Sequence, residues 1–115
     1  MITKRSFHEV APYCNFVKFD DVETKFFKPF FAFKDANTGL YTEPFSASCA
    51  EHAVMLVLNT INSNDEQNKY FLDSAPNLTL ECVFAYDYAT GEVFSNTPLV
   101  ICNVIDMLPF ESEDI

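Results

Sequence analysis

An alternating strand pattern constrains this chain more than any other stretch. From Leu78 to Asp87, the residues Leu78, Leu80, Cys82, Phe84 and Tyr86 alternate with Thr79, Glu81, Val83, Ala85 and Asp87, which is the period of two that a strand with one buried face requires. The turn formers Asp87-Tyr88-Ala89-Thr90-Gly91 follow, and a second apolar run extends from Val93 to Leu108. The sequence from Leu78 to Leu108 therefore predicts a β-hairpin whose apolar face must be covered by another element.

A second hairpin is expected earlier in the chain. Phe30 to Phe33 is predicted to be a strand, Asp35 to Gly39 a tight turn, and Leu40 to Phe45 the returning strand. Pro44 cannot donate a backbone hydrogen bond, so it either limits the returning strand or places it at a sheet edge.

One helix is predicted between the hairpins, from Ser48 to Asn62. Ser48 and Glu51 have the spacing of a capping box, in which each side chain accepts a backbone N–H of the first turn. Apolar residues then recur at helical spacing, at Ala50, Ala53, Val54, Val57 and Ile61, and Met55, Leu56 and Leu58 are expected to widen this apolar face. Asp65 to Ala75 is polar and is expected to form a loop.

These elements predict an α+β fold: a small antiparallel sheet from two β-hairpins packed against one α-helix, in ββαββ order, with an N-terminal arm or extra strand. Residues 1–27 are expected to form the arm, 28–110 a single domain and 111–115 an acidic disordered tail. The arm has no clean period. One or two helical turns and a short strand from Asn15 to Phe19 both remain open for it.

The charge of the chain is strongly acidic but unevenly distributed. Seventeen acidic and seven basic residues give a net charge of −10, which argues against general attraction to nucleic acid or anionic membranes. The first 34 residues carry six basic and four acidic side chains, whereas only Lys69 opposes thirteen carboxylates from Asp35 onward. The two parts are therefore expected to contact different partners, or each other.

The sequence contains no motif for catalysis, metal binding or a cofactor. Four cysteines lack CxxC spacing and do not group with the two histidines, so we expect buried, reduced thiols. The carboxylates, nucleophiles and bases show no diagnostic spacing, and an enzyme is not predicted. No apolar run approaches the ~18 residues of a membrane span, and a cytoplasmic location is expected.

Lysines and phenylalanines interleave near the N-terminus as they would on a surface for single-stranded nucleic acid. Aromatic faces stack on bases, and lysines contact phosphates. The candidate contact residues are Lys18, Lys25, Lys28, Lys34, Phe16 and Phe19. The simpler interpretation, favoured by the sequence alone, is that these phenylalanines are core residues and the lysines are solvated.

The order of short motifs over about residues 29 to 108 resembles a known family. The motifs are Phe33-Lys34-Asp35, Thr38-Gly39-Leu40-Tyr41, Pro44-Phe45, the helix, Leu80, Tyr86-Asp87, Thr90-Gly91-Glu92-Val93-Phe94, Pro98 and Ile105-Asp106. In this order they resemble the small nonstructural protein of gokushovirus-type Microviridae, which are single-stranded DNA phages. The helix departs from the family pattern, because Met55-Leu56-Val57 replaces a stretch that often holds a basic residue and a phenylalanine.

The resemblance implies a viral nonstructural accessory protein that binds DNA and acts in single-stranded DNA synthesis or packaging. Its expected partners are single-stranded DNA or phage replication and procapsid proteins. The alternative is an acidic protein-interaction module that inhibits or recruits a host DNA-binding protein, with its carboxylates replacing DNA phosphates. Self-association through exposed strand edges also remains open.

Overall fold

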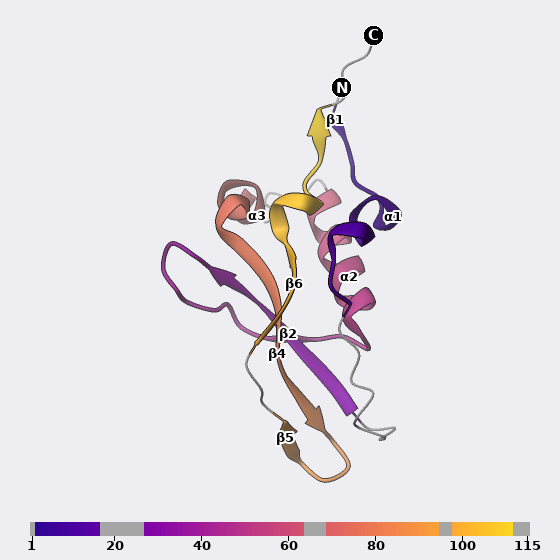
Figure 1. The fold of residues 1–115 in the computed structure, drawn as a ribbon, viewed down its shortest axis with the longest axis vertical. Coiled ribbons are helices and arrows are strands. Elements are labelled where there is room, and N and C mark those ends of the chain that lie inside the picture. The colour runs from indigo at the N-terminus through magenta and orange to yellow at the C-terminus, as the bar shows by residue number, and fades with distance from the viewer. Residues whose placement is uncertain (1, 17–26, 64–68, 95–97, 112–115) are drawn as a thin grey trace.

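The computed structural model describes residues 2–16, 27–63, 69–94 and 98–111. The fold is α+β, as predicted, with a five-stranded antiparallel sheet and helices that pack against it (Figure 1). The sheet strands are β2 (Phe27–Asp35), β3 (Phe45–Ser46), β4 (Leu78–Asp87), β5 (Glu92–Phe94) and β6 (Leu99–Asn103). The helices are α1 (Phe7–Val10), η1 (Ala11–Tyr13), α2 (Ala50–Asn62), α3 (Lys69–Ser74), η3 (Ala75–Asn77) and η4 (Val104–Met107).

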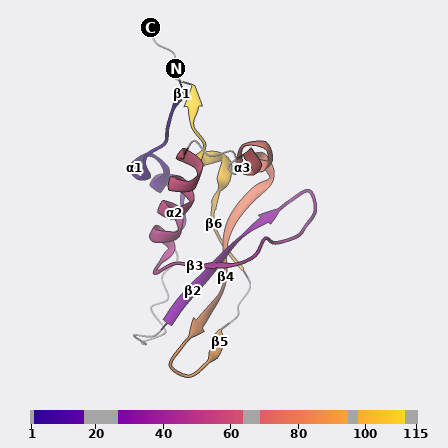
Figure 2. The same ribbon diagram turned by 180° about the vertical axis from the view of Figure 1, so that it is seen from behind.

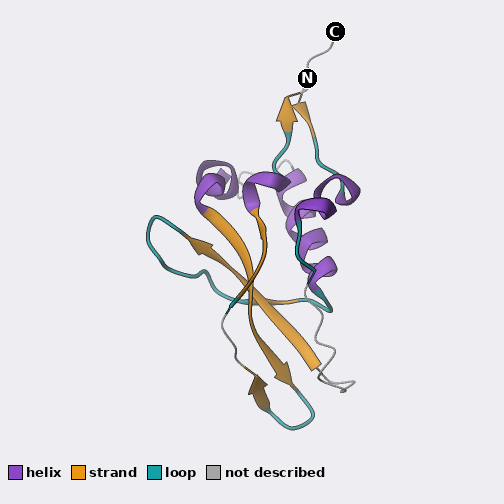
Figure 3. Cartoon of the chain, in the orientation of Figure 1, coloured by secondary structure: helices purple, strands orange, loops and turns teal. Residues whose placement is uncertain are grey.

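The long strands β2 and β4 form the centre of the sheet. The strand order is β3-β2-β4-β5. On the edge of β4 that faces away from β2, β5 pairs with residues 85–87 and β6 pairs with residues 79–82. A separate two-stranded sheet joins β1 (Ile2–Thr3) to β7 (Phe110–Glu111), so both ends of the described chain lie together (Figure 2). Figure 3 shows the helices gathered toward that end, while the β4–β5 hairpin projects the opposite way.

Both predicted hairpins are present, but their return strands are shorter than expected. Tyr41 forms only an isolated bridge to Lys34, and β3 comprises two residues instead of the predicted run from Leu40. The second return strand is divided into β5 and β6, which both pair with β4. Part of the predicted loop from Asp65 to Ala75 is wrong, because Lys69 to Ser74 form α3.

Helix α2 covers the core face of the sheet. Of the residues predicted for its apolar face, Met55 and Leu56 are exposed, and the buried ones are Ala50, Ala53, Val54, Val57, Leu58 and Ile61. They pack in one core with Phe31, Phe33, Leu78 and Leu80 from β2 and β4. Burial of a side chain the size of valine, leucine or phenylalanine contributes about 1.5–3 kcal/mol. The contact between α2 and the sheet therefore supplies most of the free energy that holds the helix in place.

The predicted capping box at Ser48 is wrong. Helix α2 begins at Ala50 with Cys49 as its N-cap residue, and the Cys49 side chain makes no capping hydrogen bond. Ser48 lies one position earlier, where its N–H donates to Nδ1 of His52 at 3.1 Å. A capping box does occur at α1, where Ser6 and Glu9 satisfy each other's backbone N–H groups.

Candidate nucleic-acid interface

One face of the sheet carries aromatic and basic side chains together, and we call it the open face. The cross-strand pairs on it are Lys28 with Tyr86, Phe30 with Phe84, Ala32 with Glu81 and Lys34 with Thr79. The alternate residues of β2, including Phe31 and Phe33, point into the core beneath α2. Over the open face the structure describes no helix (Figures 1 and 2).

A stacked phenylalanine pair lies in the middle of the open face. The rings of Phe30 and Phe84 are 4.7 Å apart between centroids and inclined by 11°. A β-bulge next to this pair leaves Val83 as an extra residue in β4, which shifts the register between Phe30 and Phe31. The bulge keeps Phe30 and Phe84 opposite each other while Phe31 and Cys82 both face the core. Both stacked rings are half-buried, so part of their surface remains accessible.

Two lysines flank the stacked pair along β2. Lys28 is exposed beside Tyr86, and Lys34 is half-buried at the other end of the strand. Six residues of extended strand separate them, which corresponds to roughly 20 Å. The Lys34 ammonium lies 5.7 Å from the ring centroid of Tyr41, within the range of a cation–π contact. The open face therefore has a positive charge on either side of its aromatic centre.

The one buried carboxylate among the described residues also belongs to this face. Glu81 is 5% exposed, and the Tyr41 hydroxyl donates to its Oε1 at 2.9 Å. Tyr41 pairs with Lys34 on the β3 side of β2, so its hydroxyl reaches across β2 to Glu81 of β4. Burial of the phenol, the hydrogen bond to Glu81 and that carboxylate's charge raise the pKa of Tyr41.

The structure separates the residues predicted to contact nucleic acid. Lys28 and Lys34 share the open face, whereas Phe16 packs against the core and stacks on Phe7, with ring centroids 5.7 Å apart. Phe16 follows a segment whose Asn15 N–H donates to the Ile101 carbonyl at 2.7 Å, which holds it beside β6. Lys18, Phe19 and Lys25 lie outside the described residues.

The sequence did not predict that the aromatic residues of the open face, Phe30, Phe84 and Tyr86, lie together on one surface. The predicted strand began at Phe30, which left Lys28 on a different element. In a strand that begins at Phe27, Lys28 and Phe30 have the same parity and must share a face. The same rule applied to β4 places Phe84 and Tyr86 together, but no local pattern indicates that β2 and β4 are neighbours.

A serine–histidine contact occurs at the start of α2. The Oγ of Ser48 lies 3.0 Å from Nδ1 of His52, and both side chains are exposed. The same nitrogen accepts the Ser48 backbone N–H, so this contact serves to orient the first turn of the helix. Within residues 2–16, 27–63, 69–94 and 98–111, no three His, Cys, Asp or Glu side chains converge as metal ligands would.

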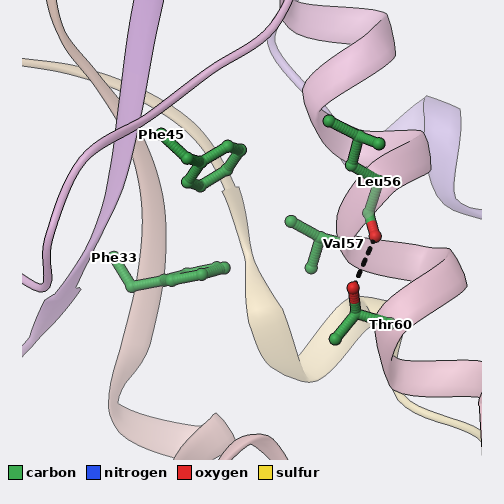
Figure 4. Close-up of a pocket in the computed structure, with 5 residues that line it drawn as sticks. All are labelled: Phe33, Phe45, Leu56, Val57 and Thr60. Atoms are coloured by element: carbon green, nitrogen blue, oxygen red, sulfur yellow. Dashed lines mark hydrogen bonds between the residues drawn. The ribbon is translucent and has the colours of Figure 1, made fainter.

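A small apolar pocket lies between α2 and the β2–β3 pair (Figure 4). Its volume is about 220 Å³, and Phe33, Phe45, Leu56, Val57 and Thr60 line it. The only hydroxyl of the lining, on Thr60, donates to the Leu56 carbonyl at 2.9 Å and is thereby satisfied within the helix. The pocket thus offers apolar contact without a polar group free to orient a ligand.

Comparison of the chain with protein-family models, with curated proteins and with solved structures gave no match. The helices that the structure describes are all too short or too polar to cross a membrane. The open face is therefore interpreted from its own residues.

Proposed function

We propose that this protein binds single-stranded nucleic acid on the open face of its sheet. The observation that carries the proposal is the stacked pair Phe30–Phe84, flanked along β2 by Lys28 and Lys34. Aromatic side chains on an uncovered sheet surface can stack with unpaired bases, and each such contact contributes roughly 1–3 kcal/mol. Lysines on both sides would contact the phosphates of the bound strand.

The acidic net charge limits the electrostatic share of this binding. Lys28 and Lys34 are the basic groups of the open face, and the Glu81 carboxylate beside them is hydrogen-bonded to Tyr41. Two phosphate contacts on a single strand predict a slope of about −1.4 for the logarithm of affinity against the logarithm of salt concentration. Stacking therefore supplies most of the proposed affinity.

The biological setting that we propose follows from the sequence resemblance. The protein would be a phage nonstructural accessory protein in the host cytoplasm, where it binds single-stranded DNA during synthesis or packaging. A genome in which its gene lies beside capsid and replication-initiation genes would support this setting. A neighbourhood of unrelated cellular genes would contradict it without affecting the binding proposal.

A protein-interaction module is the second candidate function. Exposed apolar side chains gather on the strands that pair with the outer edge of β4: Val93 and Phe94 on β5, and Leu99 and Val100 on β6. Apolar residues exposed along one edge of a sheet are typical of surfaces that bind another protein. The acidic remainder of the chain would then favour a basic partner, such as a host DNA-binding protein.

The proposal is tested by titrating fluorescently labelled single-stranded DNA at low salt. We expect Lys28→Gln and Lys34→Gln each to weaken binding and to reduce the salt slope. Phe30→Leu keeps an apolar side chain but removes the stacking surface, and a loss of about tenfold is expected. Lys4→Gln is the matched control, because Lys4 is exposed on the N-terminal segment away from the open face.

Two results would contradict the proposal. The first is the absence of binding to the unmodified protein at low salt. The second is equal weakening by Lys4→Gln and Lys28→Gln, which would indicate general charge attraction and no defined face. Val100→Ser distinguishes the second candidate function from nucleic-acid binding. This variant should reduce capture of a basic protein partner and leave DNA affinity unchanged.

A further inference from the structure

Two cysteines from distant parts of the chain lie opposite each other beside β6. Cys14 has an extended backbone, with φ −107° and ψ 146°, directly after η1. The next residue, Asn15, donates its N–H to the Ile101 carbonyl at 2.7 Å, and its side-chain amide donates to the Val100 carbonyl at 3.4 Å. Residues 14–16 run antiparallel to β6 in Figure 1. In an antiparallel pair joined by the Asn15–Ile101 bond, Cys14 stands opposite Cys102.

A hydrogen bond with Cys102 is the largest influence on the pKa of Cys14, which agrees with the backbone register in placing the two thiols near each other. Residues opposite each other in an antiparallel pair have Cα atoms about 4.5–5.5 Å apart, and a disulfide requires roughly 4.4–6.8 Å. A covalent bond between the two sulfurs therefore fits this backbone without a large movement.

The two thiols differ in their surroundings. Cys102 is 3% exposed in the core, whereas Cys14 is only half-buried and its Sγ lies 3.4 Å from the Val10 carbonyl oxygen. The hydrogen bond with Cys102 lowers the pKa of Cys14, and it outweighs the opposing effects of burial and of the Asp106 charge. The same pairing, together with burial, raises the pKa of Cys102. Cys14 is thus the thiol that forms a thiolate first and meets a small oxidant first.

We infer that Cys14 and Cys102 form a reversible intramolecular disulfide when a hydroperoxide oxidises the protein, and that this bond fastens the N-terminal segment to β6. The feature that carries the inference is the backbone register that sets the two thiols opposite each other. The modification site lies apart from the open face and does not depend on the proposed function.

The reaction consumes one hydroperoxide and balances in two steps. The Cys14 thiolate attacks one peroxide oxygen, the O–O bond breaks, and Cys14 becomes a sulfenic acid while the released hydroxide takes up the thiol proton. The Cys102 sulfur then attacks the Cys14 sulfur, the S–O bond breaks, and the leaving hydroxide takes the Cys102 proton as water. With hydrogen peroxide, two thiols yield one disulfide and two waters. A dithiol reductant reverses the reaction by thiol–disulfide exchange.

Hydrogen peroxide at a small molar excess over the native protein provides the test. After oxidation, free thiols are alkylated in denaturant, and the chain is cut with trypsin and with an endoproteinase specific for glutamate. Cleavage at Glu92 separates Cys82 from Cys102. We expect a peptide containing Cys14 linked to one containing Cys102, with Cys49 and Cys82 alkylated. The link should be lost on treatment with dithiothreitol.

Variants make the result specific to this pair. Cys14→Ser should abolish the crosslink, and Cys49→Ser should leave it unchanged, because Cys49 lies at the start of α2. Cys14 is half-buried, so its serine variant is the one expected to keep the fold; far-ultraviolet circular dichroism checks this. The oxidised protein should unfold at a urea concentration about 1–3 M higher than the reduced protein, because the bond closes a long loop.

Three outcomes would overturn the inference. Oxidation of Cys14 to sulfinic acid without a crosslink would show that Cys102 does not reach it. A crosslink between other cysteines, or between two protein molecules, would show that a different pair reacts first. A disulfide between Cys14 and Cys102 that lowers the urea midpoint would show that the bond forms only by distorting the native backbone.

Discussion

Tyr41 shows how a single hydroxyl supports a buried charge. The Glu81 carboxylate is almost inaccessible to water, and the phenol at 2.9 Å replaces part of its lost hydration. The Tyr41 ring also lies beneath the Lys34 ammonium, so one side chain contacts both charged groups at this end of the open face. Removal of the hydroxyl therefore affects more than an exposed tyrosine normally would.

We expect Tyr41→Phe to lower the free energy of unfolding by about 1–3 kcal/mol, since it leaves a buried acceptor without its donor. Urea unfolding at neutral pH measures the loss. Tyr13→Phe is the control, because Tyr13 is 64% exposed and its variant should be neutral. Equal stability of the two variants would show that the Tyr41–Glu81 hydrogen bond contributes nothing.

The raised pKa of Tyr41 predicts a dependence on alkaline pH. The folded protein holds the phenol proton more tightly than the unfolded chain, so the stabilisation is complete below the usual tyrosine pKa of about 10. It is lost as pH rises above that value, because the unfolded chain ionises first. The stability difference between the unmodified protein and Tyr41→Phe should therefore shrink as the pH rises above about 10. A constant difference above that pH would contradict the raised pKa.

At the scale of elements, two similar turns end the long strands. Both begin with an aspartate whose Oδ1 accepts a backbone N–H two residues later, at Asn37 and at Ala89. Both end in a glycine with positive φ, 73° at Gly39 and 81° at Gly91. The similar sequences Asp-Ala-Asn-Thr-Gly and Asp-Tyr-Ala-Thr-Gly therefore specify the same local geometry.

We expect Gly91→Ala to cost about 1–2 kcal/mol, which is the penalty of the left-handed conformation for an L-residue. No atom lies within 4 Å of the added Cβ, so the cost is confined to the backbone. Gly91→Asn should cost less, because asparagine tolerates this conformation better. Thermal unfolding ranks the stability of the two variants. An equal loss of stability in both would show that the added side chain, and not the positive φ, causes the effect.

The start of α2 shows why a local motif can fail. Ser48 and Glu51 have the right spacing for a capping box, yet the backbone enters the helix one residue later and His52 takes the Ser48 N–H. The buried Ala47 and Ala50 on either side fix where the chain meets the sheet. The first helical residue is therefore set by the packing of these alanines in the core and not by the spacing of the capping motif.

At the scale of the whole molecule, the N-terminal segment completes the core. Val10 is fully buried among α2 and the sheet, and the Asn62 side chain donates to the Arg5 carbonyl at 3.0 Å. Arg5 in turn donates from Nε to the Leu108 carbonyl at 3.2 Å. These contacts connect the beginning of the chain to the end of α2 and to Leu108, which lies between η4 and β7.

We expect Val10→Ala to reduce the free energy of unfolding by roughly 2 kcal/mol, because it opens a cavity in the core. Tyr13→Ala, at an exposed position of the same segment, should change stability little. Urea denaturation followed by circular dichroism compares them. If the two variants were equally stable, the N-terminal segment would not belong to the cooperative unit.

Local patterns predicted the elements that repeat a clear period. The alternation from Leu78 and the helical spacing from Ala50 both correspond to observed elements. In β4, however, the bulge at Val83 turns Phe84 and Tyr86 away from the face of Leu78, Leu80 and Cys82, with which the alternation grouped them. Met55 and Leu56 of α2, predicted for its apolar face, are exposed. Of the open face, the sequence indicated Lys28 and Lys34 but not Phe30, Phe84 or Tyr86. Their joint position depends on the pairing of β2 with β4, whose partner residues lie 43 to 60 positions apart in the chain.

The sequence by itself determined the class of fold, the apolar face of α2 and the conformation of the two glycine turns, because each follows from the sterics and periodicity of neighbouring residues. Only the tertiary structure decided that β2 and β4 lie side by side, that Val10 enters the core and that Cys14 meets Cys102. Those outcomes depend on contacts between residues far apart in the chain, whose relative burial no local pattern specifies. The open face is a product of that pairing, since its residues become one surface only when the two long strands join.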